Sequence, residues 1–131
     1  MDSRSTVLIV DDEVHIRRIL CRMVRQAGYS VTEAASGDEA LGYLDADGFD
    51  VVISDIRMPH MDGLQLLNRI KHSHPQTSVV MMTGYAGDYP ISRIMSAGAD
   101  HYIAKPFGNA DVAAALREIE EQRKGGWSAI S

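Results

Sequence analysis

Three acidic residues, a threonine and a lysine could carry chemistry together in this sequence. They are Asp11, Asp12, Asp55, Thr83 and Lys105, and each stands at the end of a short, mostly apolar run. Several carboxylates in one small volume repel one another, so at least one takes up a proton unless a cation is present. A few carboxylates, completed by waters and a backbone carbonyl, suit Mg²⁺. The residue types therefore predict a magnesium site, provided that the fold brings these positions together.

Lysine and threonine would complete a set of groups for phosphoryl transfer. Lys105 would add a fixed positive charge opposite the acids, and Thr83 a small hydroxyl donor. Mg²⁺, an ammonium and a hydroxyl together neutralise and orient a transferring phosphoryl group. Asp55 is then the candidate nucleophile, which would form an aspartyl phosphate. A purely structural explanation is disfavoured, because acids that face one another at strand ends destabilise a fold unless they are used.

Short runs rich in β-branched residues alternate with segments of helical spacing. Runs that are apolar throughout are typical of strands covered on both faces, as in a parallel sheet. The predicted strands cover residues 6–10, 30–32, 51–53, 78–82 and 102–104. The predicted helices cover residues 16–27, 36–44, 62–74, 91–95 and 112–121. This alternation predicts a doubly wound α/β domain with a five-stranded parallel sheet and helices on both faces.

The predicted sheet explains why the strand ends matter. Ligands of open α/β sheets bind outside the carboxyl ends of the strands, where the strand order reverses. If the first and third strands are neighbours, their backbones lie about 4.8 Å apart, and Asp11, Asp12 and Asp55 converge. Zinc is not expected, because Cys21 is the single cysteine and the five histidines are scattered.

The first predicted helix has the clearest apolar stripe. Its members are Ile16, Ile19, Leu20, Met23, Val24 and Ala27, and Gly28 follows as a C-terminal stop. Cys21 lies off this stripe, and we expect no redox role for it. Arg17, Arg18, Arg22 and Arg25 also lie outside the stripe. These arginines fit either a solvated face or a docking patch.

Length and composition fit one globular domain. The chain has 131 residues, of which 45% are hydrophobic and 24% charged. Its net charge of −5 argues against direct nucleic-acid binding. No apolar run approaches the roughly 18 residues of a membrane span or begins a signal peptide, and we expect a cytoplasmic protein. Residues 123–131 fit no element and are interpreted as a C-terminal tail or truncated linker, which leaves residues 1–122 as the domain.

The motifs around the candidate residues resemble those of the receiver domains of bacterial two-component response regulators. In chain order they are Leu8-Ile9-Val10-Asp11-Asp12-Glu13, Ser54-Asp55-Ile56-Arg57-Met58-Pro59, Met61-Asp62-Gly63, Met82-Thr83-Gly84-Tyr85, Ala97-Gly98-Ala99-Asp100, and Tyr102 with Ala104-Lys105-Pro106-Phe107. Each motif alone is weak, but all of them in order at predicted strand ends are a strong signal. The resemblance covers residues 6–122 and implies the strand order 2-1-3-4-5, flanked by five helices.

The resemblance implies roles for the acidic residues. Asp55 would be the phosphoacceptor. Asp12, Asp55 and the backbone carbonyl of Arg57 would bind Mg²⁺, and Asp11 would act partly through water. Arg57 and Tyr85 occupy positions where the family tunes the lifetime of the phosphoryl group, although ordinary surface occupancy explains them equally well.

The resemblance also implies a switch. Lys105 would contact the phosphoryl group, and its bond to Pro106 can be cis. Thr83 would move towards the phosphoryl oxygen while the aromatic ring of Tyr102 turns inward, although simple packing at the sheet edge is the alternative for Tyr102. Phosphorylation would favour one arrangement of the fourth helix, fifth strand and fifth helix, the face that would meet a partner.

The implied function is a signalling switch, not an enzyme, although receiver domains promote their own phosphotransfer and dephosphorylation. The phosphoryl donor would be a sensor histidine kinase, which the arginines of the first helix could help to dock, or a histidine phosphotransfer protein. Output would pass to a downstream protein or to an output domain missing from this chain, without direct contact to nucleic acid or membrane. Ala115 stands where dimerising DNA-binding regulators carry a basic residue, so we expect a monomer or weak dimer.

Three alternatives use the same topology or site. A phosphatase of the haloacid-dehalogenase type also has a strand-end Asp nucleophile, but it normally has a second Asp two residues on, where this chain has Arg57. A pseudo-receiver would bind partners without phosphorylation and would not need the full site. A flavodoxin-like electron carrier needs a hydroxyl-rich phosphate loop after the first strand, where this chain has acids.

Overall fold

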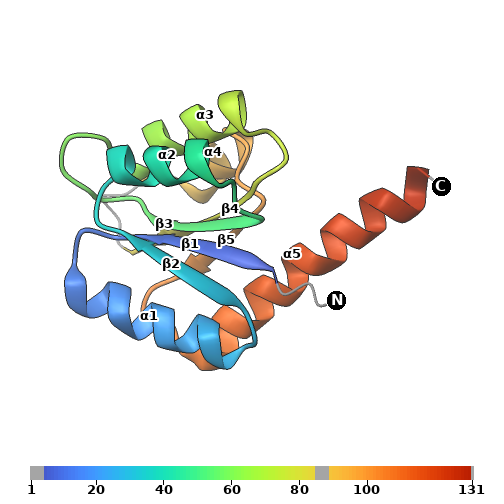
Figure 1. The fold of residues 1–131 in the computed structure, drawn as a ribbon, viewed down its shortest axis with the longest axis horizontal. Helices are drawn as coiled ribbons and strands as arrows, with labels where there is room; N and C mark the ends of the chain where they lie inside the picture. The colour runs from blue at the N-terminus through green and yellow to red at the C-terminus, as the bar shows by residue number, and fades with distance from the viewer. Residues whose placement is uncertain (1–4, 85–88, 131) are drawn as a thin grey trace.

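The computed structural model describes residues 5–84 and 89–130. Within these residues, five strands alternate with five helices, as predicted (Figure 1). The strands are β1 (Thr6–Val10), β2 (Ser30–Ala34), β3 (Val51–Asp55), β4 (Ser78–Thr83) and β5 (His101–Ala104). The helices are α1 (Val14–Gln26), α2 (Gly37–Ala46), α3 (Gly63–Ser73), α4 (Ile91–Ser96) and α5 (Asn109–Ile130).

The strands form one parallel sheet with the order β2-β1-β3-β4-β5. Helices α1 and α5 cover one face, and α2, α3 and α4 cover the other (Figure 1). The predicted doubly wound fold and its strand order are therefore confirmed. The order reverses between β1 and β3, so the carboxyl ends of these two strands form the place where such sheets bind ligands.

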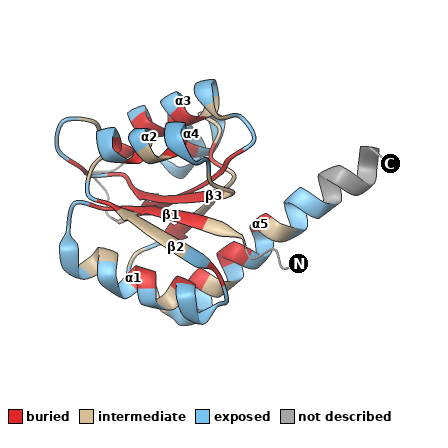
Figure 2. Ribbon diagram, in the orientation of Figure 1, coloured by how far each residue is buried: buried red, intermediate tan, exposed pale blue. Residues whose placement is uncertain are grey.

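Two apolar layers enclose the sheet. Successive residues of β1 point to opposite faces, so that Leu8 packs towards α2, α3 and α4, whereas Ile9 packs towards α1 and α5. The central strands β1, β3 and β4 are almost wholly buried (Figure 2). Because both faces are covered, these strands read as continuous apolar runs without alternation.

The buried face of α1 differs in part from the predicted stripe. Leu20, Cys21 and Val24 are buried against the sheet, whereas Ile19 is 44% exposed. The prediction that Cys21 lies off the apolar face was therefore wrong. A free cysteine packs as a small apolar residue, which helical spacing of aliphatic residues alone does not reveal. Burial raises the pKa of its thiol to about 11, which disfavours the reactive thiolate.

Helix α5 is longer than the sequence pattern indicated. It continues to Ile130, so the prediction that residues 123–130 belong to no element was wrong. The two glycines at 125–126 do not end the helix, because each costs only about 1 kcal/mol relative to alanine inside a helix. Neither α5 nor any other helix within the described residues is long and apolar enough to span a membrane.

Arg123 joins α5 to the amino edge of the sheet. Its Nη1 donates to the carbonyl oxygens of Asp50 at 3.0 Å and Gln76 at 3.1 Å, and to the hydroxyl of Ser78 at 2.9 Å. This residue, assigned to the tail by its sequence, therefore contacts the domain. The boundary after residue 122 stays a prediction.

The start of α3 is packed closely behind the end of β3. Asp62 caps the helix through a reciprocal pair of hydrogen bonds with Gln65. Gly63 donates its backbone N–H to the carbonyl of Ile56 at 2.8 Å. A side chain at this glycine would bring its Cβ to 2.7 Å from the Cα of Ile56. The glycine thus allows α3 to begin directly against the segment that follows Asp55.

We expect Gly63→Ala to lower the free energy of unfolding by about 3 kcal/mol, because backbone atoms cannot yield to the added methyl group. Gly42→Ala in α2 is the matched control, since a Cβ at Gly42 meets nothing within 4 Å. This control should gain up to about 1 kcal/mol from helix propensity. Urea unfolding measures both, and equal stability of Gly63→Ala and wild type would contradict the close packing.

Candidate functional site

The register of the sheet brings the predicted acidic residues together. Val10 of β1 pairs with Ser54 of β3, so the residues that follow them, Asp11 and Asp55, lie side by side at the carboxyl edge of the sheet. One carboxylate oxygen from each of Asp11, Asp12 and Asp55 lies within 4.8 Å of the other two. The predicted convergence is confirmed, and such a cluster could hold a metal ion.

Asp11 is fully buried, and only one of its two carboxylate oxygens accepts a hydrogen bond from the described residues. Its Oδ1 accepts a hydrogen bond from the backbone N–H of Glu13 at 2.9 Å, whereas its Oδ2 has no partner among the described residues. Burial, and to a lesser extent the charge of Asp55, raises the pKa of Asp11 from 3.8 to about 6. A cation or its bound water would satisfy the unpartnered oxygen and relieve the repulsion. The donor set therefore fits a hard divalent cation.

Asp55 and Lys105 form an ion pair at the same edge. Asp55 is 7% exposed, and its Oδ1 accepts hydrogen bonds from the backbone N–H of Ile56 at 2.8 Å and from Lys105 Nζ at 3.0 Å. The Lys105–Pro106 peptide bond is cis, as the resemblance allowed. The predicted opposition of the lysine to the acids is confirmed.

Thr83 ends β4 next to this pair. It is buried, and its carbonyl accepts a hydrogen bond from the backbone N–H of Lys105 at 2.7 Å. Tyr102, on β5, is half-buried, and its ring stacks on that of His101 with 5.9 Å between centroids. The structure thus places both proposed switch residues on the β4–β5 side of the sheet. Their roles stay predictions.

Two further candidate residues, Arg57 and Tyr85, are not placed in the acidic cluster by the structure. Arg57 is an exposed residue that follows Asp55 and Ile56. Its backbone carbonyl remains a predicted metal ligand. Tyr85 lies outside the described residues.

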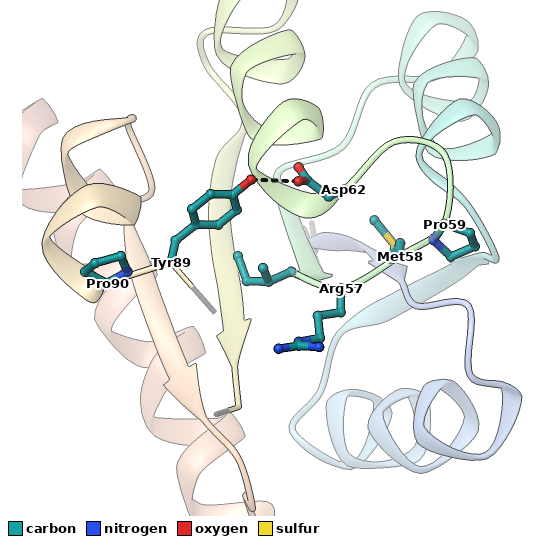
Figure 3. Close-up of a pocket in the computed structure, with 7 residues that line it drawn as sticks. Arg57, Met58, Pro59, Asp62, Tyr89 and Pro90 are labelled. Carbon is teal, nitrogen blue, oxygen red and sulfur yellow. Dashed lines mark hydrogen bonds between the residues drawn. The ribbon is translucent and has the colours of Figure 1, made fainter. Parts of the chain in front are cut away.

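A pocket of about 710 Å³ lies beside the segment that follows Asp55. Its lining residues are Ile56, Arg57, Met58, Pro59, Asp62, Tyr89 and Pro90 (Figure 3). Tyr89 donates its hydroxyl to Asp62 Oδ2 at 2.8 Å, and this bond raises the pKa of Tyr89. The start of α3 is therefore linked to the residue that precedes Pro90 and α4. Sequence reasoning missed this link, because no spacing rule relates residues 27 positions apart.

A doubly wound sheet of this order, with three aspartates and a lysine at the carboxyl edge, defines the class of CheY-like receiver domains. The family model described as response regulator receiver domain matches residues 7–117. The chain belongs to this family.

Known proteins agree with this assignment. The C4-dicarboxylate transport transcriptional regulatory protein DctD of Rhizobium meliloti is 38% identical over 95% of this chain and 27% of its own length. The DNA-binding transcriptional regulator NtrC of Klebsiella pneumoniae is 45% identical over 86% of this chain and 24% of its own. The chain thus spans about a quarter of these relatives. A solved CheY-like receiver domain protein of Methanospirillum hungatei superposes with a TM-score of 0.85 at 34% identity, covering 94% of this chain and 99% of its own.

We expect Asp11→Asn to stabilise the protein in EDTA by about 2–3 kcal/mol at about pH 8, because a neutral amide replaces a buried carboxylate that faces two others. The folded chain holds the Asp11 proton more tightly than the unfolded chain does. Wild type therefore loses stability as the pH rises through about 6, and the advantage of the variant shrinks below that pH.

Urea unfolding at about pH 8 and about pH 4.5 measures this difference. Glu121→Gln, at an exposed position of α5, removes a carboxylate outside the cluster and should change stability little at either pH. A variant at Asp11 that is less stable than wild type at the higher pH would refute the unfavourable ionisation.

Proposed function

We propose that this receiver domain is a phosphorylation-dependent switch that accepts a phosphoryl group on Asp55. The observation that carries the proposal is the contact of Lys105 Nζ with Asp55 Oδ1 at 3.0 Å, beside two further carboxylates. A buried carboxylate with a fixed ammonium on one side and a cation-binding cluster on the other is suited to phosphoryl transfer.

The reaction forms one bond and breaks another. A carboxylate oxygen of Asp55 attacks the phosphorus of a phosphohistidine, the P–N bond breaks, and the histidine nitrogen leaves with the electron pair. Lys105 balances negative charge on the phosphoryl oxygens, and the backbone N–H of Ile56 holds the carboxylate in place. The carboxyl end of β3 thus carries the acceptor, and the end of β5 carries the charge that stabilises it.

Mg²⁺ is the proposed cofactor, and it would neutralise charge on the acids and on the incoming phosphoryl group. Asp12, Asp55 and the backbone carbonyl of Arg57 would hold it, with Asp11 contributing through water. The support from the structure is Oδ2 of Asp11, a buried carboxylate oxygen with no hydrogen-bond partner in the part of the chain that the structure describes, which a cation or its bound water would satisfy.

The proposed donor is a sensor histidine kinase or a histidine phosphotransfer protein. The proposed receiver of the signal is a downstream protein or an output domain, reached through the α4–β5–α5 face. Position 115 is an alanine, which carries no charge and is 1% exposed in the core between α5 and the sheet. The alanine in place of a basic residue supports the proposal of a monomer or weak dimer.

Asp55→Asn should gain no phosphoryl mass when it is incubated with Mg²⁺ and acetyl phosphate, because the amide cannot act as the nucleophile. Wild type and Asp38→Asn should both gain it, since Asp38 is an exposed residue in the first turn of α2. Intact-protein mass spectrometry provides the measurement. Equal phosphorylation of Asp55→Asn and wild type, or none in wild type, would refute the proposal.

The proposed switch runs through Thr83 and Tyr102. Added charge and acceptor oxygens at Asp55 would draw the Thr83 hydroxyl towards the phosphoryl group. Because Lys105 and Thr83 are joined by a backbone hydrogen bond, the ends of β4 and β5 would respond together. The ring of Tyr102 would then turn inward, and the population would shift towards the arrangement that a partner recognises.

Thr83→Ala should still be phosphorylated on Asp55 but should lose most of the conformational response, because the hydroxyl that follows the phosphoryl group is gone. The measurement is the change in amide NMR shifts of α4, β5 and α5 on phosphorylation. Thr32→Ala, on the distant edge strand β2, should respond as wild type does. A full response in Thr83→Ala would exclude this route.

A further inference from the structure

Arg17 differs from the other arginines of α1 in being held at both ends of its guanidinium group. Its side chain is only 15% exposed. The Nε atom donates to Glu33 Oε1 on β2 at 2.8 Å, and Nη1 donates to the backbone carbonyl of Asp11 at 2.9 Å. Arg18, the next residue, is exposed. Arg17 is therefore oriented by one strand and directed at the end of another.

The carbonyl that Arg17 contacts belongs to the peptide bond between Asp11 and Asp12, two of the three acids of the cluster. The N–H of Asp11 donates to the carbonyl of Ala34 at 3.1 Å, and its Oδ1 is bonded to the N–H of Glu13. With the contact from Arg17, the N–H, the carbonyl and one carboxylate oxygen of Asp11 each have a hydrogen-bond partner. The remaining oxygen, Oδ2, has no hydrogen-bond partner within the described part of the chain.

We propose that Arg17, oriented by Glu33, is a positioning residue for the divalent-cation site. Its guanidinium holds the Asp11–Asp12 peptide in the orientation that presents both carboxylates to the cation. The inference rests on the proposed function for the identity of the ion, and it adds a residue that contacts neither the ion nor the phosphoryl group. Glu33 takes part only through Arg17.

The charge of Arg17 and its hydrogen bond to Asp11 have opposite effects on the affinity for Mg²⁺. A substitution can therefore distinguish a positioning role from a purely electrostatic one. The positive charge of Arg17 near the acids opposes the approach of a cation, so loss of that charge alone would tighten Mg²⁺ binding. Loss of the hydrogen bond to the Asp11 carbonyl would free the peptide and weaken binding. Groups that orient metal ligands typically change the affinity by about 10-fold or more when removed.

The test compares Arg17→Met with Arg18→Met by isothermal titration calorimetry with Mg²⁺. Both variants lose one positive charge from adjacent positions of α1, but only the first loses contacts to Asp11 and Glu33. We expect the dissociation constant of Arg17→Met to rise about 10-fold and that of Arg18→Met to stay at or below the wild-type value. Equal or tighter binding by Arg17→Met would overturn the proposal.

A second measurement without metal separates this proposal from the proposed function. The Glu13 amide, bonded to Asp11 Oδ1, should exchange with deuterium faster in Arg17→Met than in Arg18→Met when both are in EDTA. If wild type binds no Mg²⁺, the proposed function fails, and this exchange rate alone decides the role of Arg17. Unchanged exchange would then overturn it.

Arg17→Lys provides a variant that retains the charge if Arg17→Met does not fold. A single ammonium cannot reproduce the two directed contacts of the guanidinium, so the Lys variant should bind Mg²⁺ more weakly than wild type. Arg18→Lys is its control and should bind as wild type does. Equal affinities in the two lysine variants would overturn the positioning role.

Discussion

Mutual repulsion of carboxylates at one edge of the sheet is the constraint on which the other features of the site depend. The pairing of β1 with β3 forces Asp11 and Asp55 together whether or not a cation is bound. One oxygen of Asp11 has no hydrogen-bond partner among residues 5–84 and 89–130, and burial makes ionisation of this carboxyl group unfavourable. The folded chain alone therefore carries a local electrostatic cost, which Lys105 relieves on one side and which a bound divalent ion would relieve on the other.

The scaffold keeps these groups close by contacts that lie outside the cluster. Arg17 and Ala34 hold the backbone of Asp11 from α1 and β2. The N–H of Ile56 holds Asp55, and Gly63 lets α3 begin against the same segment. Preorganisation of this kind means that binding a cation or a phosphoryl group requires little rearrangement of the acids themselves. The proposed switch residues, Thr83 and Tyr102, lie on the other side of the site.

The other side of the site is formed by β4, β5 and the residues that precede α4. The hydrogen bond between Lys105 and Thr83 links the two strand ends, and the bond between Tyr89 and Asp62 links α3 to the segment before α4. A change of charge at Asp55 would act on the hydrogen-bonded ends of β4 and β5 directly, because Lys105 contacts Asp55. Hydrogen bonds therefore join the β1–β3 end of the sheet to α1 and β2, and the β4–β5 end to Asp55 through Lys105.

Local spacing of residue types was sufficient to predict the alternating strands and helices, the doubly wound sheet, and the aspartates and lysine of the cluster. Such patterns are set by burial of each element and by the rule that parallel strands end at one edge. The burial of Cys21, the continuation of α5, the Tyr89–Asp62 bond and the reach of Arg17 back to Asp11 required the packed chain. Each depends on how elements distant in sequence approach one another, and side-chain contacts across such distances leave no periodic signal in the chain.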